Sequence, residues 1–205
     1  MNTRSFYRLV PVLVAAALFI ACNAKKDKAP ETKPEDKTAP GFIPYVPLLE
    51  KQVALVDSTP LGIYKYTTDS TGRQDSVLIE RSEFKQLAKI FLEPDIMQQM
   101  EKYTSGSFGD QSTGLVIFTY SAKDPASEIR SLNLRFKPGT PSKFTSLDMV
   151  RSSSGRTVKL FWKSNRFFHI ITDLGNGQYT KVEVAWNASA PEPEVEKLDI
   201  PQIVK

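Results

Sequence analysis

The second half of the chain alternates apolar and polar residues with a period of two, and this pattern most constrains the fold. Six strands are expected in this half, at 114–121, 129–136, 143–151, 156–163, 166–173 and 178–187, and the first of them is apolar on both faces, as expected of a covered or central strand. Such alternation is typical of strands that bury one face of a sheet. The turns S-S-S-G, S-N and L-G-N-G separate the last four segments, and loops this short join antiparallel neighbours. The sequence therefore predicts an antiparallel β-meander.

The preceding residues predict a hairpin and one or two helices. Segments 61–67 and 76–81 are rich in β-forming residues and flank the turn D-S-T-G. From Ser82, a possible N-cap, Phe84, Leu87, Ala88 and Phe91 form one apolar helical stripe that ends before Pro94. A second short helix is expected in D-I-M-Q-Q-M-E-K-Y, with Ile96, Met100 and Tyr103 on one side, and a loop over 103–114. The predicted fold class is α+β, a meander sheet packed against one or two short helices in a single domain, residues 48–189.

Residues 1–21 have the charged start and short apolar run of a secretory signal, which is too short to span a bilayer as a helix. The run ends at Cys22, and F-I-A-C at 19–22 resembles the lipobox of bacterial lipoproteins, with Phe19 where the family usually has Leu. The resemblance implies cleavage before Cys22 by signal peptidase II and a diacylglycerol on its thiol. Asn23, in place of the Asp that tends to retain such lipoproteins at the inner membrane, favours the outer membrane.

Two further segments lack the composition of a packed core. Residues 22–47 hold five prolines and alternate Lys with Asp or Glu, as expected of a disordered tether that follows the lipidated cysteine. Residues 190–205 read as an extended, acidic C-terminal tail. If Arg4 and Arg8 leave with the signal, the formal net charge of +4 becomes +2. We therefore expect no nucleic-acid partner.

The composition also limits the chemistry that the chain can perform. One Cys and one His give neither a disulfide framework nor a multi-histidine metal site, and no phosphate loop or nucleophile elbow occurs. We therefore expect no metal and no cofactor. His169 shares a predicted strand face with Phe167 and Ile171, and we interpret it as a packed or edge residue rather than a general base.

Aromatic residues near the end of the chain allow two interpretations. Trp162, Trp186, Phe161, Phe167 and Phe168 could stack on sugar rings or lipid chains, but a sheet core needs the same residue types. Because Trp162 aligns with Val158 and Leu160, and Trp186 aligns with Val182 and Val184, core packing is the favoured interpretation.

The alternation also predicts a basic outward face. If the apolar positions of these strands point inward, their neighbours point outward, and these are Arg135, Lys137, Lys159, Lys163 and Lys181, with Glu183 as the only acid. Such a face either keeps the sheet soluble or binds an anionic partner such as lipopolysaccharide, phospholipid head groups or an acidic protein.

Three functions follow as hypotheses. The first is a non-enzymatic binding or accessory module of the bacterial envelope, held at the membrane by its lipid. The second is a carrier that encloses a lipid or other hydrophobic ligand in an apolar cavity. A curved sheet that embraces a helix is similar, in architecture only, to the lipoprotein-carrier folds of the periplasm. The third is a hydrolase that uses carboxylates.

Overall fold

The computed structural model describes residues 41–139 and 143–186. The predicted signal, Cys22, most of the predicted tether and the predicted C-terminal tail lie outside these residues. Among the described helices, none is long and apolar enough to cross a membrane.

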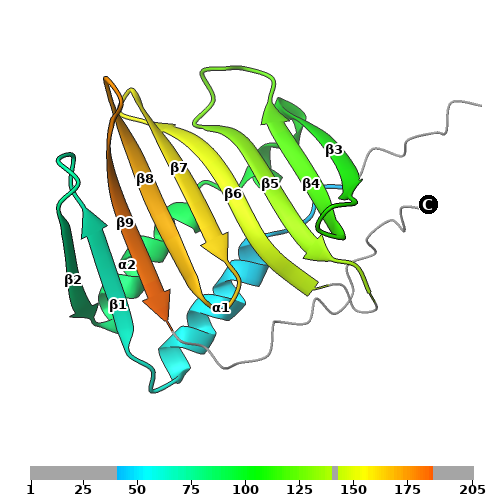
Figure 1. The fold of residues 1–205 in the computed structure, drawn as a ribbon. Coiled ribbons are helices and arrows are strands. Elements are labelled where there is room, and N and C mark those ends of the chain that lie inside the picture. The colour runs from blue at the N-terminus through cyan, green and yellow to red at the C-terminus, as the bar shows by residue number, and fades with distance from the viewer. Residues whose placement is uncertain (1–40, 140–142, 187–205) are drawn as a thin grey trace, which may run out of the picture. The chain divides into compact units, whose positions relative to one another are not determined.

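The described chain forms nine antiparallel strands, two α-helices and a 3-10 segment (Figure 1). In chain order the elements are α1 Val46–Ser58, β1 Ile63–Thr68, β2 Gln74–Ile79, α2 Arg81–Leu92, η1 Ile96–Lys102, β3 Tyr103–Asp110, β4 Leu115–Ala122, β5 Ile129–Lys137, β6 Lys143–Ser153, β7 Arg156–Lys163, β8 Phe167–Gly175 and β9 Gln178–Trp186. The order across the sheet is β2-β1-β9-β8-β7-β6-β5-β4-β3. The predicted α+β class, with a meander sheet packed on short helices, is confirmed.

Four local expectations differ from the structure. Helix α2 begins at Arg81 with Glu80 as its N-cap residue, so Ser82 lies inside the helix rather than capping it. Helix α1 has no counterpart among the predicted elements. The expected loop over 103–114 contains β3, which pairs along its whole length with β4. The expected second helix is the 3-10 segment η1, with a kink at Gln99, and Met100 is exposed rather than packed beside Ile96.

The helices cover one face of the sheet, and large side chains fill the space between them. Phe84, Ala88 and Phe91 of α2 are fully buried, as the apolar stripe predicted. The ring of Phe91 lies 5.2 Å from that of Trp162, and the ring of Phe84 lies 5.1 Å from that of Trp186. Each fully buried side chain of this kind contributes about 1.5 to 3 kcal/mol of transfer free energy. The interior of the domain is therefore a packed aromatic core.

The folded part begins earlier than residue 48, where the sequence placed its start. Tyr45 is fully buried, and Ile43 is 5 % exposed. The backbone N–H of Ile43 donates to the Tyr120 hydroxyl at 3.0 Å, and the ring of Phe42 stacks on the same tyrosine. The tether predicted over residues 22–47 therefore ends earlier than residue 47, because Phe42, Ile43 and Tyr45 already pack in the core.

A buried glutamine ties α1 to strand β7 and to the turn that follows it. Gln52 is 1 % exposed, and its Oε1 accepts hydrogen bonds from the Trp162 indole at 2.9 Å and the Asn165 backbone N–H at 3.0 Å. Asn165 adopts a positive φ of 56° in the turn between β7 and β8. The same side chain thus holds a core indole and the backbone of a strained turn.

Candidate functional site

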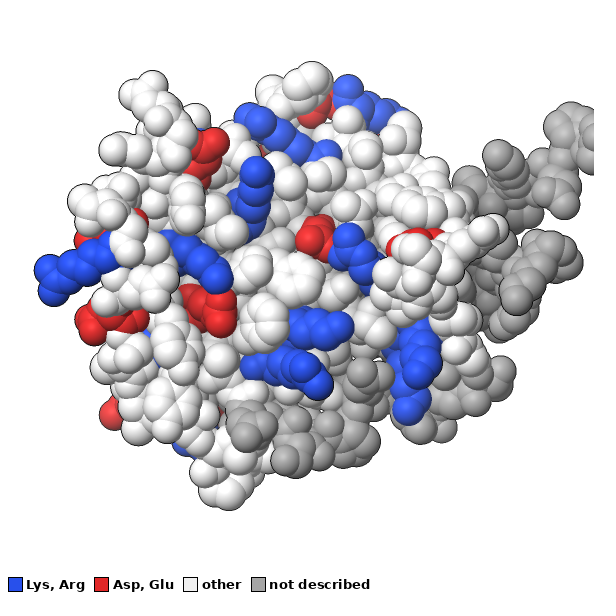
Figure 2. All heavy atoms as spheres, viewed as in Figure 1, with Lys and Arg blue, Asp and Glu red and all other residues white. Residues whose placement is uncertain are grey.

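The sheet face opposite the helices, which we call the open face, is shown in Figure 2. The strand register arranges its side chains in rows across neighbouring strands. One row contains Leu78, Tyr64, Ala185, Phe167, Lys163, Ser146 and Arg135. The next contains Ser76, Tyr66, Glu183, His169, Phe161, Asp148 and Asn133. A third contains Gln74, Thr68, Lys181, Ile171, Lys159 and Val150.

Three rings gather at the centre of the open face, on β7 and β8. The Phe161 ring stacks on the imidazole of His169 at 5.1 Å, and Phe167 lies 5.9 Å from Phe161 and 6.0 Å from His169. All three side chains are only partly buried. We call Phe161, Phe167 and His169 the aromatic cluster.

The five aromatic residues that the sequence singled out therefore divide between the two faces. Core packing is confirmed for Trp162, Trp186 and Phe168, which are at most 3 % exposed. It is wrong for Phe161 and Phe167, because their strand positions alternate with those of the core residues and point away from the helices.

The imidazole of His169 lies beside the rings of Phe161 and Phe167 and near two charged side chains. Partial burial lowers its pKa, the ammonium of Lys181 lowers it further, and the carboxylate of Glu183 opposes both effects. Its Nδ1 has no hydrogen-bond partner among the described residues. The imidazole packs against the Phe161 ring, as the sequence interpretation expected.

The five basic residues that the sequence assigned to one face do lie on the open face, but two of them are paired there. Arg135 forms an ion pair with Asp148, and the Lys181 ammonium lies 2.6 Å from a carboxylate oxygen of Glu183. Sequence reasoning missed Asp148, which β6 inserts between the strands that carry the basic residues. Glu183 is thus not the only acid on this face.

Lys137, Lys159 and Lys163 form no ion pair within the described part of the chain. Lys159 and Lys163 flank Phe161 along β7, and Lys163 lies opposite Phe167 of the aromatic cluster. In Figure 2, Lys and Arg atoms are spread over the open face with white atoms between them, and acidic atoms adjoin some of them. The unpaired lysines Lys159 and Lys163 therefore lie next to partly buried rings.

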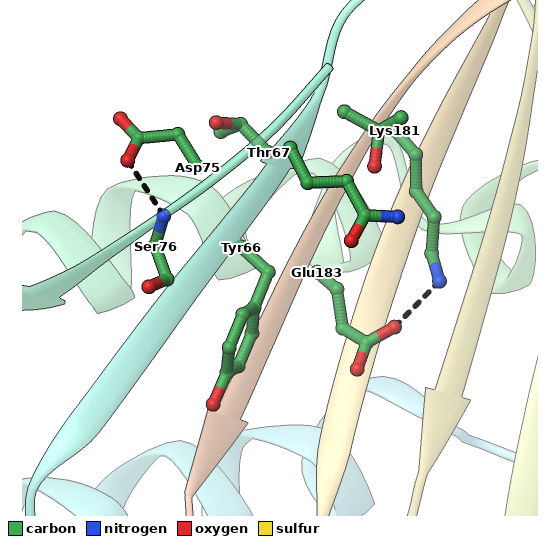
Figure 3. A pocket seen from close by; sticks show the side chains of 8 residues that line it. Tyr66, Thr67, Asp75, Ser76, Lys181 and Glu183 are labelled. Carbon is green, nitrogen blue, oxygen red and sulfur yellow. Dashed lines mark hydrogen bonds and ion pairs between the residues drawn. The ribbon is translucent and has the colours of Figure 1, made fainter. Parts of the chain in front are cut away.

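A hollow of about 510 Å³ lies at the side of the open face, where the β1–β2 hairpin meets β9. Figure 3 shows Tyr66 beside Glu183, with Lys181 reaching the Glu183 carboxylate. The Asp75 carboxylate instead accepts a hydrogen bond from the Ser76 backbone N–H at 2.9 Å. The hollow is lined by Tyr66, Thr67, Thr68, Gln74, Asp75, Ser76, Lys181 and Glu183.

Three carboxylates at strand ends and in turns accept hydrogen bonds from residues close to them in the sequence. Asp110 accepts hydrogen bonds from the hydroxyls of Thr113 and Ser112, which lower its pKa to about 2. Asp124 accepts from the Ala126 N–H and Asp173 from the Gly175 N–H. Within residues 41–139 and 143–186, no three His, Cys, Asp or Glu side chains come together as a metal site would need.

Comparisons with known proteins assign no family to this arrangement. No protein-family model matches the chain, and a search of curated proteins finds no match. The functional argument therefore rests on the side chains of the open face.

Proposed function

We propose that this protein is a lipid-anchored, non-enzymatic binding module of the bacterial envelope, in the outer membrane rather than the inner. Its attachment is inferred from the lipobox-like residues that end at Cys22. A diacylglycerol-modified cysteine holds a protein at a bilayer stably, because more than one chain is buried there. The partner is an anionic component of the envelope that binds the open face.

The observation that carries this proposal is the sequence Lys159-Leu160-Phe161-Trp162-Lys163 as β7 presents it. Leu160 and Trp162 point into the core, so two lysines and a phenylalanine share the open face. Residues two apart on a strand lie about 7 Å apart, so Lys159 and Lys163 lie on either side of Phe161 along the strand. A ligand with anionic groups and an apolar surface could contact both features at once.

The packed interior favours this function over that of a carrier. A carrier needs an apolar cavity, whereas the space between α2 and the sheet holds Phe84, Phe91, Trp162, Phe168 and Trp186 in mutual contact. A lipid could enter only if these rings moved apart. The surface next to the unpaired lysines needs no such rearrangement.

The proposal is tested with vesicles that contain an anionic phospholipid, using the chain from residue 23 onward so that the lipid anchor does not contribute. Lys159→Glu combined with Lys163→Glu should weaken binding at least tenfold, since both charges reverse. Binding by the wild-type chain should also weaken steeply with salt, because the Debye length falls from about 10 Å at 0.1 M to about 3 Å at 1 M.

The matched control is Lys51→Glu combined with Lys89→Glu, which changes the net charge equally on the two helices. Both lysines are exposed and lie on elements that cover the opposite face. The control variant should bind nearly as well as the wild type. Equal losses in the two variants would mean that only net charge matters, and unchanged binding in both would contradict the proposal.

A further inference from the structure

We propose that the hollow between the β1–β2 hairpin and β9 is a saccharide-binding site. This inference goes beyond the proposed function and does not depend on it, because it uses a different part of the open face. It rests on the arrangement of polar groups around the Tyr66 ring and on the kinds of ligand that this arrangement disfavours.

The register builds the hollow as a small grid of side chains on three strands. Tyr66 lies between its strand partners Ser76 and Glu183, and Thr68 lies between Gln74 and Lys181. Neighbouring strands are about 4.8 Å apart, and same-face residues along a strand are about 7 Å apart. One ring is thus surrounded, within about 10 Å, by two hydroxyls, an amide, a carboxylate and an ammonium group.

The Tyr66 ring is available to a ligand. Tyr66 is 43 % exposed on the open face, so its ring can be reached from solvent. An exposed aromatic face contributes apolar contact area with little loss of conformational freedom on binding. The face of a sugar ring carries C–H groups that pack on such a surface, while its edge carries hydroxyls.

The charges around the hollow argue against other ligand classes. Lys181, the only ammonium of the lining, is already paired with Glu183, so a phosphate would meet an occupied cation and a nearby carboxylate. A divalent cation needs several convergent oxygens, but the Asp75 carboxylate bonds to its own strand. An apolar ligand would leave the ion pair and the hydroxyls without solvent.

A hydroxyl-rich, uncharged ligand satisfies every one of these groups. Glu183 accepts hydrogen bonds, Lys181 donates them, and Gln74, Thr68 and Ser76 can do both. Because the Lys181–Glu183 pair is already formed, these two groups need little reordering when a polyol binds between them. The volume of about 510 Å³ lies within the usual range of small-molecule sites. A disaccharide is therefore the ligand class that we assign to the hollow.

The test is isothermal titration of the full lipidated chain, in a detergent that contains no sugar, with cellobiose, maltose and di-N-acetylchitobiose as probes. At least one probe should bind with a dissociation constant of about 1 mM or below. Tyr66→Ala should weaken that binding about tenfold, and Tyr66→Phe should preserve it, because the ring face is what the ligand contacts.

Tyr64→Ala is the matched control, since Tyr64 is 50 % exposed, lies on the same strand and face, and does not line the hollow. It should leave disaccharide binding unchanged. Failure of all three probes to bind would overturn the proposal, as would an equal effect of Tyr64→Ala and Tyr66→Ala. Vesicle binding should be unaffected by Tyr66→Ala, so the two proposals can fail separately.

Discussion

The buried amide of Gln52 makes the sharpest prediction about stability. Gln52→Met keeps the length and helix propensity of the side chain but removes the oxygen that accepts from Trp162 and Asn165. Both donors then lie in a buried setting without this acceptor, since Trp162 is fully buried and Asn165 is 4 % exposed.

The magnitude follows from the cost of an unsatisfied buried donor, about 1 to 3 kcal/mol each. Two such donors lose one shared acceptor, and the greater apolar character of methionine offsets part of the cost. We therefore expect a loss of about 3 kcal/mol in the free energy of unfolding. With a urea m-value of about 2 kcal/mol/M, the unfolding midpoint should fall by about 1.5 M.

Urea unfolding followed by tryptophan fluorescence measures this directly, because both tryptophans lie in the core. Gln86→Met is the control, because it is the same substitution at an exposed position of α2. It should move the midpoint by no more than a few tenths of a molar. A Gln52→Met midpoint equal to that of the control would refute the assignment of Gln52 as the anchor of α1.

Two further predictions concern Cys22 and His169. Cys22→Ala should abolish labelling with radioactive palmitate and leave the uncleaved precursor in immunoblots, because there is no thiol to acylate; release of a soluble mature form from the wild-type gene would contradict the lipoprotein proposal. The fold lowers the pKa of His169 below its ordinary value of 6.5. Because the unfolded chain then protonates this imidazole more readily than the folded chain does, acid favours unfolding. The contribution of His169 to the free energy of unfolding is therefore present above pH 6.5 and is lost as the pH falls toward the folded-state pKa. The melting temperature should therefore drop less between pH 7 and pH 5.5 in His169→Phe than in the wild type, and equal drops would show that other groups account for the change.

The strands of the meander were predictable because each is a local pattern bounded by a local turn. The six predicted segments match β4 to β9 within two residues at every boundary. The turns at Ser154, Asn165 and Asn176 all adopt positive φ, which their Ser, Asn and Gly sequences allow. Alternation and turn chemistry therefore agree, and no long-range information was needed.

Helix α1 and strand β3, which the sequence did not predict, lack a clear local pattern. In α1 the buried positions are Leu48, Leu49, Gln52 and Val56, so a buried polar residue interrupts the apolar stripe. In β3 the sequence S-G-S-F-G contains residues with little preference for strands, and the pairing with β4 imposes the extended conformation.

The candidate sites show the same limit. The basic positions of single strands could be read from alternation, but the Arg135–Asp148 pair depends on β6 lying beside β5. The hollow depends on the pairing of β1 with β9, which brings Tyr66 opposite Glu183 from the other end of the domain. No local sequence signal identifies that partner strand.

The pairing of β1 with β9 also determines when the domain can fold. Ile63 lies opposite Trp186, so a strand near the beginning of the domain finds its neighbour only after the last strand exists. Closing so long a loop is entropically costly and slow compared with forming successive hairpins. During synthesis, β3 to β8 can assemble in order, while β1, β2 and the ring of Phe84 still lack their contacts with β9 and Trp186. A ribosome stalled before β9, or a nonsense mutation there, would leave a nascent chain whose hairpin has no sheet to join and whose core rings remain open to chaperones and proteases.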